Sequence, residues 1–330
     1  MSLLPVVLST LLAGAASAAP AEEVSVDLAD EQYQRRLVAA MQASDSPRER
    51  ALSMYVVDLA TLNQPQGKRL RDASDAAPAD ELVQYLWSSL GARDDGCSPP
   101  HPCPGRVFAL SRLTPENGVA WLAPLAQSAN AKDAAGVDTA LARIAAAERY
   151  DDFFIEGMRA WTRVLDGVPR TAADLGGHRS GLPPENLSLV QATAYAALLP
   201  LNGSTTELVR ACDRGRNSGA SDQHWLDCAR AGRLMYRTGT SDVSQRIGFV
   251  LVRNSGLETP EDRQARRRDD WRMSAFIGLA ESLEHDPAEW RQYFRDLDST
   301  GNEARAQELL LTRRGIALEP AAGWKSSLFR

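Results

Sequence analysis

Residues 114–150 read TPENGVAWLAPLAQSANAKDAAGVDTALARIAAAERY, and their apolar positions follow the periodicity of two short helices. Apolar residues recur at spacings of three and four on both sides of a polar break at residues 130–133, and this spacing places them on one face of a helix. The two predicted faces consist of Val119, Leu122, Leu125 and Ala126 and of Val137, Ala140, Leu141 and Ile144. Because so short a link brings the faces together, the stretch predicts an antiparallel helical hairpin.

The start of this hairpin carries a typical helix-initiation signal. Thr114 can cap a helix, Pro115 suits the first helical position because no donor is needed there, and Glu116 suits the positive end of the helix dipole. A capping residue followed by proline also occurs at Ser46-Pro47, Thr259-Pro260 and Asp286-Pro287. We therefore predict that each of these helices begins at its proline.

Helical periodicity also accounts for most of the remaining chain, and no strand-like alternation of useful length is present. Residues 63–77 are polar and are predicted to form a loop before the next helical pattern. Basic and acidic residues interleave in one predicted helix, which favours a salt-bridged outer face over a nucleic-acid patch; they are Arg263, Arg266, Arg267 and Arg268 with Asp262, Asp269 and Asp270. Because the intervals between the proline starts are irregular, we predict an all-α fold of roughly a dozen antiparallel helices, arranged as a helical-hairpin solenoid or an irregular bundle.

The hairpin resembles those of tetratricopeptide proteins, because Trp121-Leu122 lies on its first helix and small alanine-rich positions lie on its second. The resemblance covers residues 114–150 only, and the first helix lacks the Gly and Tyr that the family places there. It implies a helical repeat that binds another protein or a peptide on a concave face.

The composition is that of a globular protein. The chain has 330 residues, of which 44% are hydrophobic and 24% are charged, and its formal net charge is -6. Since binding to phosphate backbones requires a clustered positive surface, we expect no nucleic-acid partner.

Residues 1–18 have the apolar core and the Ala16-Ser17-Ala18 ending of a signal peptide, so cleavage is expected before Ala19. Residues 19–330 would then form one all-helical domain, with a subdivision near residues 97–105. Ala15 stands where a lipoprotein signal would need cysteine. No later apolar run reaches the length of a membrane span, so we expect no membrane insertion and a periplasmic or secreted location.

Four cysteines suit an oxidising compartment, and their spacing favours Cys97–Cys103 and Cys212–Cys228 disulfides. The first pair flanks a proline-rich segment that contains His101. A disulfide-closed structural loop is the favoured interpretation of this segment, with a recognition loop or a Cys/His metal site as alternatives. The second pair would join two neighbouring helices.

Residues 166–184 are rich in Gly and Pro and lack periodicity. His178 and Arg179 could form part of an anion-binding turn there. A solvated connector is the interpretation we favour, and whether this loop is functional stays open at this point.

The sequence lacks the usual signatures of catalysis and metal binding, such as paired histidines or a G-x-S-x-G motif. Asp296, Asp298 and Thr300 resemble the start of a calcium-binding EF-hand loop, but Gln307 replaces its bidentate Glu. Glu281 followed by Ser282 resembles the catalytic pair of helical enzymes that cleave peptidoglycan, without their downstream glycine motif.

We therefore expect a non-enzymatic exported protein that needs no cofactor and binds a protein or peptide partner in the cell envelope. An inhibitor or immunity partner of a secreted toxin and an envelope assembly factor both fit this expectation. The alternative is a cell-wall hydrolase that uses Glu281 or His178 as acid or base.

Overall fold

The computed structural model describes residues 28–60, 66–90, 104–169, 192, 196, 199, 203–284 and 286–326. Over these ranges the secondary structure is helical, and no strand is formed. A single isolated β-bridge joins Asn117 to Arg149. The prediction of an all-α fold is confirmed.

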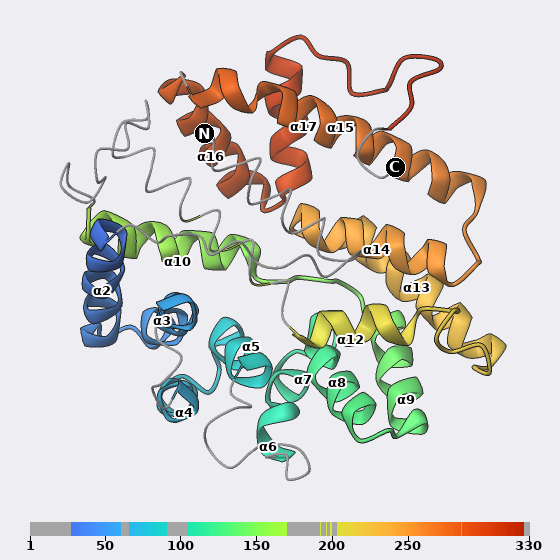
Figure 1. Cartoon of the computed structure of the whole chain (residues 1–330), viewed down its shortest axis with the longest axis horizontal. Coiled ribbons are helices and arrows are strands. Elements are labelled where there is room, and N and C mark those ends of the chain that lie inside the picture. The colour runs from blue at the N-terminus through green and yellow to red at the C-terminus, as the bar shows by residue number, and fades with distance from the viewer. Residues whose placement is uncertain are drawn as a thin grey trace.

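Figure 1 shows the arrangement of the described helices, several of which are joined to the next by only a few residues. In chain order they are α2 (Leu28–Ala43), α3 (Pro47–Ala60), α4 (Gln66–Ala76), α5 (Glu81–Leu90), α6 (Pro104–Val107), α7 (Ala109–Leu113), the 3-10 helix η1 (Gly118–Trp121), α8 (Leu122–Asn130), α9 (Ala134–Ala145), α10 (Phe154–Gly167), α12 (Gly203–Ala211), α13 (Asp222–Thr238), α14 (Asp242–Asn254), α15 (Pro260–Glu284), α16 (Pro287–Thr300) and α17 (Glu303–Arg313).

Most helices pack against their neighbour in sequence, as in α2–α3, α8–α9, α13–α14 and α16–α17. Figure 1 shows the N-terminal helices on one side of α10 and α15–α17 on the other. Helix α10 contacts α2, α3 and α16, so it connects the two halves of the molecule. It buries Phe154, Ile155, Met158, Trp161, Val164 and Leu165. These side chains form the centre of the core.

The helical hairpin predicted for residues 114–150 is confirmed, but its start differs from the prediction. Thr114 and Pro115 lie outside the helix, and Asn117 caps η1 by accepting a hydrogen bond from the Val119 N–H at 3.3 Å. The reason is that residues 116–118 bind the chain just after α9. Gly118 N–H donates to the Arg149 carbonyl at 2.8 Å, and this contact is incompatible with a helix that begins at Pro115.

The other proline starts are confirmed, since α3, α15 and α16 begin at Pro47, Pro260 and Pro287. Asp286 caps α16 by accepting a hydrogen bond from the Glu289 N–H at 3.1 Å. The prediction of a loop over residues 63–77 is wrong, because α4 covers Gln66–Ala76. Leu70 and Ala73 are buried on its inner face, so tertiary packing stabilises a helix whose sequence is mostly polar.

The predicted disulfide between Cys212 and Cys228 is present, with a Cα–Cα distance of 5.6 Å. It joins the end of α12 to α13, and a loop of this length contributes about 3 kcal/mol in the chain-entropy model. Cys97, Cys103 and the predicted signal peptide at residues 1–18 lie outside the described residues. Among the helices that the structure describes, none combines the length and apolar character that a membrane crossing requires.

Candidate functional site

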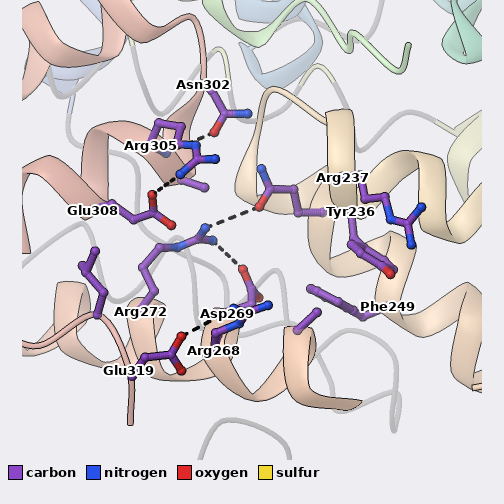
Figure 2. A pocket seen from close by; sticks show the side chains of 14 residues that line it. Tyr236, Arg237, Phe249, Arg268, Asp269, Arg272, Asn302, Arg305, Glu308 and Glu319 are labelled. Carbon is purple, nitrogen blue, oxygen red and sulfur yellow. Dashed lines mark hydrogen bonds and ion pairs between the residues drawn. The ribbon is translucent and has the colours of Figure 1, made fainter. Parts of the chain in front are cut away.

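A pocket of about 440 Å³ lies in the C-terminal half of the chain, where α13, α14, α15, α17 and the C-terminal tail meet (Figure 2). Arginine, acidic and aromatic side chains share its lining. The lining residues are Tyr236, Arg237, Gln245, Phe249, Ala265, Arg268, Asp269, Arg272, Asn302, Ala304, Arg305, Glu308, Leu318 and Glu319.

The aromatic wall of the pocket depends on the close approach of α13 and α14. A Cβ atom on Gly232 would lie 2.6 Å from the Gly248 carbonyl oxygen, and one on Gly248 would lie 2.5 Å from the Gly232 carbonyl oxygen. Both positions therefore require glycine. Next to this contact, the rings of Tyr236 on α13 and Phe249 on α14 stack with centroids 4.5 Å apart. The Tyr236 hydroxyl donates to Asp262 at 2.7 Å, which fixes this ring in the wall.

The turn between α13 and α14 is held by hydrogen bonds to the carboxylate of Asp152, a fully buried residue just before α10. The Thr240 hydroxyl donates to Asp152 Oδ1 at 2.7 Å, and the Ser241 and Ser244 hydroxyls both donate to Oδ2. Phe154 N–H also donates to Oδ1, at 3.1 Å. These hydrogen bonds stabilise the buried carboxylate. Because the donors lie at the start of α10 and in the α13–α14 turn, Asp152 links α10 to the pocket wall.

Residues at the start of α17 also form hydrogen bonds to the turn between α13 and α14. Asn302 donates its side-chain amide to the Gly239 carbonyl at 2.9 Å, and Glu303 N–H donates to the Thr240 carbonyl at 2.9 Å. Asp242 N–H in turn donates to Glu303 Oε2 at 2.8 Å. Burial and the nearby charge of Asp242 raise the pKa of Glu303 well above its ordinary value, which favours the neutral carboxyl group.

Arg272 lies at the floor of the pocket and carries a buried ionic network. Its guanidinium group donates to Asp242 at 2.7 Å, to Asp269 at 2.5 Å and to Gln245 at 3.4 Å. Burial raises the pKa of Asp269 to about 6, although the neighbouring arginines Arg272 and Arg246 oppose this increase. The Nε–H of Arg272 is buried and has no hydrogen-bond acceptor among the described residues.

Three further arginines lie around the rim of the pocket, and two of them are paired. Arg305 binds Glu308 at 2.7 Å, and Arg268 lies 3.4 Å from Glu319. Arg237 forms no ion pair within the described part of the chain. Its guanidinium group lies 5.6 Å from the centroid of the Tyr236 ring, and its side chain is exposed. Figure 2 shows Arg237 beside the Tyr236 and Phe249 rings.

This set of side chains is suited to binding. The ionisable groups of the lining are its arginines together with Tyr236, Asp269, Glu308 and Glu319. No group of three His, Cys, Asp or Glu side chains that could hold a metal ion occurs among the described residues. The arginines and the aromatic wall provide an anion-binding and an apolar surface side by side.

Most of the residues singled out in the sequence lie outside this description. His101, His178, Arg179, Cys97 and Cys103 lie outside the described residues. Glu281 lies on α15, and its side chain is outside the described set as well. The structural loop favoured for residues 97–105, the solvated connector favoured for residues 166–184, and their functional alternatives therefore stay predictions, as does the hydrolase alternative.

The residues that resemble an EF-hand are described, and they are not brought together. Helix α16 continues through Thr300, so Asp296 and Asp298 lie two positions apart on a helix and point in different directions. Asp296 binds Arg313 at 2.5 Å, and Asp298 binds Arg159 at 2.5 Å. The Thr300 hydroxyl donates to the Asn302 carbonyl at 3.0 Å. Both carboxylates therefore serve as ion-pair partners between helices.

The charged run at residues 261–270 was predicted to form an outer face, and this prediction is only partly correct. Arg263, Arg267 and Arg268 are exposed, whereas Asp262 and Asp269 are buried. Asp262 accepts from Arg233 at 2.8 Å on α13. The mixture of Arg and Asp predicted ion pairs, but the sequence alone does not show that Asp262 and Asp269 face neighbouring helices instead of solvent.

Asp152, Arg237 and Arg272 were not predicted as site residues from the sequence. For Asp152 a usable signal was present, because an Asp two residues before a helix and a Thr-Ser pair before another helix are both capping residues. Their mutual contact spans 88 residues in sequence, and no local rule predicts such a pairing.

Asp151, beside Asp152, gives the protein a specific pH dependence. Burial and the charge of Glu156 raise its pKa to about 6, with Asp152 adding to the increase and the Phe153 N–H and Arg149 opposing it. A raised folded pKa means that the folded protein binds the proton more tightly than the unfolded chain. Asp151 should therefore contribute about 1 kcal/mol to an increase in the free energy of unfolding between pH 7 and pH 5, and Asp269, whose pKa is raised to the same value, should add to the increase in the same window.

Urea unfolding at pH 4, 5, 6 and 7 measures this effect, and the Asp151→Asn variant is its control. The stabilisation is fully present below the unfolded pKa near 4 and is lost as the pH rises through 6. In Asp151→Asn the profile should lose this component. A variant that keeps the whole increase between pH 7 and pH 5 would show that another group is responsible.

Comparison of the sequence with protein-family models, with curated proteins and with solved structures finds no match.

Proposed function

We propose that this protein is a non-enzymatic binding protein that holds a segment of a peptide or protein partner in the pocket between α13, α14, α15 and α17. The tetratricopeptide resemblance of residues 114–150 belongs to the same proposal, because it concerns helical proteins that bind partners.

The single observation that carries the proposal is Arg237. It is an exposed arginine without a carboxylate partner in the described part of the chain, and it lies against the aromatic ring of Tyr236 at the pocket. Arginine beside an aromatic side chain is the combination that is enriched at the energetic centres of protein interfaces. The wall that carries Arg237 is held by Asp152 and by the start of α17, so little ordering is needed on binding.

We also propose that the protein acts outside the cytoplasm, in the periplasm or after secretion. The Cys212–Cys228 disulfide supports this location, because such bonds persist in oxidising compartments. The partner is then a component of the cell envelope. Inhibition of a secreted toxin and envelope assembly are both compatible with a binding protein of this kind.

The test is purification of the tagged mature chain from the envelope of the producing cells. We expect a stoichiometric complex with one partner, and we expect Arg237→Gln to release that partner. Incubation with purified peptidoglycan should give no soluble products. Turnover of peptidoglycan that is lost in Glu281→Gln would overturn the proposal in favour of the hydrolase alternative.

A further inference from the structure

We infer that one face of α15 recognises a β-turn that ends in an aromatic residue, and that the partner carries such a turn. Arg267 and Trp271 form this turn-binding face. In the free protein the C-terminal tail supplies the turn through residues 321–324, so the tail is a resident occupant that the partner replaces. The inference rests on the proposed function, because it specifies the chemistry of the partner segment next to the pocket.

The tail forms a tight turn where it meets α15. Figure 1 shows the tail leaving the end of α17 and returning to α15. Trp324 N–H donates to the Ala321 carbonyl at 3.1 Å, which closes a β-turn over residues 321–324. Gly323 has a φ of 82°, in the left-handed region that favours glycine. The tail therefore presents its main-chain carbonyls and an aromatic ring to α15 from a closed turn.

Arg267 binds the main chain of the turn at both of its ends. Its Nη2 group donates to the Ala321 carbonyl at 2.9 Å and to the Trp324 carbonyl at 3.3 Å. Because both acceptors belong to the main chain, this contact depends on the shape of the turn and not on the identity of its side chains. Closure of the turn is what brings the two carbonyls to one guanidinium group.

Trp271 binds the aromatic residue at the end of the turn. It lies four residues after Arg267, so both side chains are on one side of α15. The rings of Trp271 and Trp324 pack edge to face with centroids 5.4 Å apart, an arrangement that gains more than burial alone. The Trp271 indole N–H donates to the Ala317 carbonyl at 2.7 Å, which orients its ring. The face therefore favours an aromatic side chain at this position of a turn.

The resident turn can leave α15 without unfolding of the helices. None of residues 312–326 is buried, and the hydrogen bonds from Arg267 and Trp271 are exposed. Segments with few buried contacts and exposed hydrogen bonds open at a small cost in free energy. Helix α17 stays anchored by the buried Leu310 and Leu311. The tether keeps the turn at a high local concentration, and a partner turn can take its place.

The turn-binding face is continuous with the pocket. Arg268 and Glu319 line the pocket and lie 3.4 Å apart. Arg268 is the neighbour of Arg267 on α15, and Glu319 precedes the turn by two residues. A partner segment in the pocket therefore reaches the turn-binding face as it leaves the pocket at this edge. Because Glu319 lies before the turn, this part of the pocket wall stays in place when residues 321–326 leave.

The probe for this inference is a synthetic peptide with the sequence of residues 318–325, fluorescein-Leu-Glu-Pro-Ala-Ala-Gly-Trp-Lys-amide. Fluorescence anisotropy measures its binding to the full mature chain and to the Trp324→Ala variant. We expect the variant to bind the peptide at least about 10-fold more tightly, because the resident turn of the unmodified chain competes at a local concentration on the order of mM. Equal affinity of the two chains, or a Kd above about 1 mM for the variant, would overturn the inference.

Changed peptides test the turn and the aromatic residue separately. Replacing the Gly of the peptide by D-Ala should keep the affinity, whereas L-Ala should weaken binding at least about fivefold, because only the D residue adopts a positive φ readily. Replacing the Trp of the peptide by Ala should weaken binding at least about 10-fold. Equal binding of the D-Ala and L-Ala peptides would show that no turn is recognised.

Arg267→Gln, introduced into the Trp324→Ala chain, should weaken binding of the unchanged peptide at least about fivefold. Arg263→Gln in the same chain is the matched control. Arg263 is exposed, lies one helical turn earlier on α15, and pairs with Glu258 at 3.9 Å instead of the tail. Its affinity should equal that of the Trp324→Ala chain. Equal losses in the two arginine variants would contradict the inference.

The same peptide tests whether the partner uses this face. Added in excess to the stoichiometric envelope complex, the peptide should release more of the partner than the peptide with Ala in place of Trp. Equal release by the two peptides would overturn the inference, and the complex itself would still support the proposed function. If no complex forms, the proposed function fails, whereas the peptide titrations still decide whether the face recognises a turn.

Discussion

Replacing Asp152 by alanine is expected to lower the free energy of unfolding by about 3 to 5 kcal/mol, since buried donors that lose a charged acceptor carry a high desolvation cost. The Thr240, Ser241 and Ser244 hydroxyls and the Phe154 N–H all donate to this carboxylate. Urea unfolding followed by circular dichroism measures the loss. The effect also reaches the pocket, because the turn after α13 depends on the same contacts.

Asp133→Ala is the matched control for this prediction. Asp133 is an exposed residue that caps α9 by accepting one hydrogen bond from the Gly136 N–H at 3.0 Å. Loss of an exposed cap costs about 1 kcal/mol. A loss in Asp152→Ala no larger than that in Asp133→Ala would show that the buried carboxylate is not the link between α10 and the α13–α14 turn.

The second large effect is expected for Gly232→Ala, which should destabilise the protein by about 2 to 3 kcal/mol through overpacking. The added methyl group would lie 2.6 Å from the Gly248 carbonyl oxygen and 2.8 Å from a methyl carbon of Val252. A backbone carbonyl cannot rotate away as a side chain can, so α13 and α14 must separate. Urea unfolding gives the magnitude of the loss.

The same substitution at Gly278 should have the opposite sign. Gly278 lies in the interior of α15, is exposed, and has nothing within 4 Å of an added Cβ atom. Gly278→Ala should therefore stabilise the protein by up to about 1 kcal/mol, because alanine loses less backbone entropy in a helix. If Gly232→Ala were also stabilising, the close helix contact would be contradicted.

Local sequence signals predicted much of the fold. The spacing of Leu122, Leu125, Leu141 and Ile144 predicted the helical hairpin, and all four side chains are buried. The positions of Pro47, Pro260 and Pro287 predicted where three helices begin. Such signals succeed because helix periodicity and capping depend on residues within a few positions of one another.

The signals failed where a distant contact competes with a local one. Pro115 suits a helix start, but residues 116–118 instead bind residues 148–149 after α9. The segment of α4 is mostly polar, and Leu70 and Ala73 on its buried face pack it against the core. Both errors come from tertiary interactions that exceed local preferences of a few tenths of a kcal/mol per residue.

The candidate site was less accessible to sequence analysis than the fold. Tyr236, Phe249, Arg272 and Glu319 come from four segments of the chain, and no short motif unites them. Arg237 is one of many arginines in the sequence, and its lack of a carboxylate partner appears only when the surrounding helices are in place. A binding site made of convergent side chains is a property of the packing, whereas a catalytic motif is often local.

Hydrogen exchange of the full mature chain, alone and in its stoichiometric envelope complex, tests the central claim that the partner binds at this pocket. We expect protection of residues 234–249, 265–272 and 302–319, with unchanged exchange in α4 and α5. Protection confined to α2–α5 or to α8–α9, with the pocket segments unchanged, would contradict it.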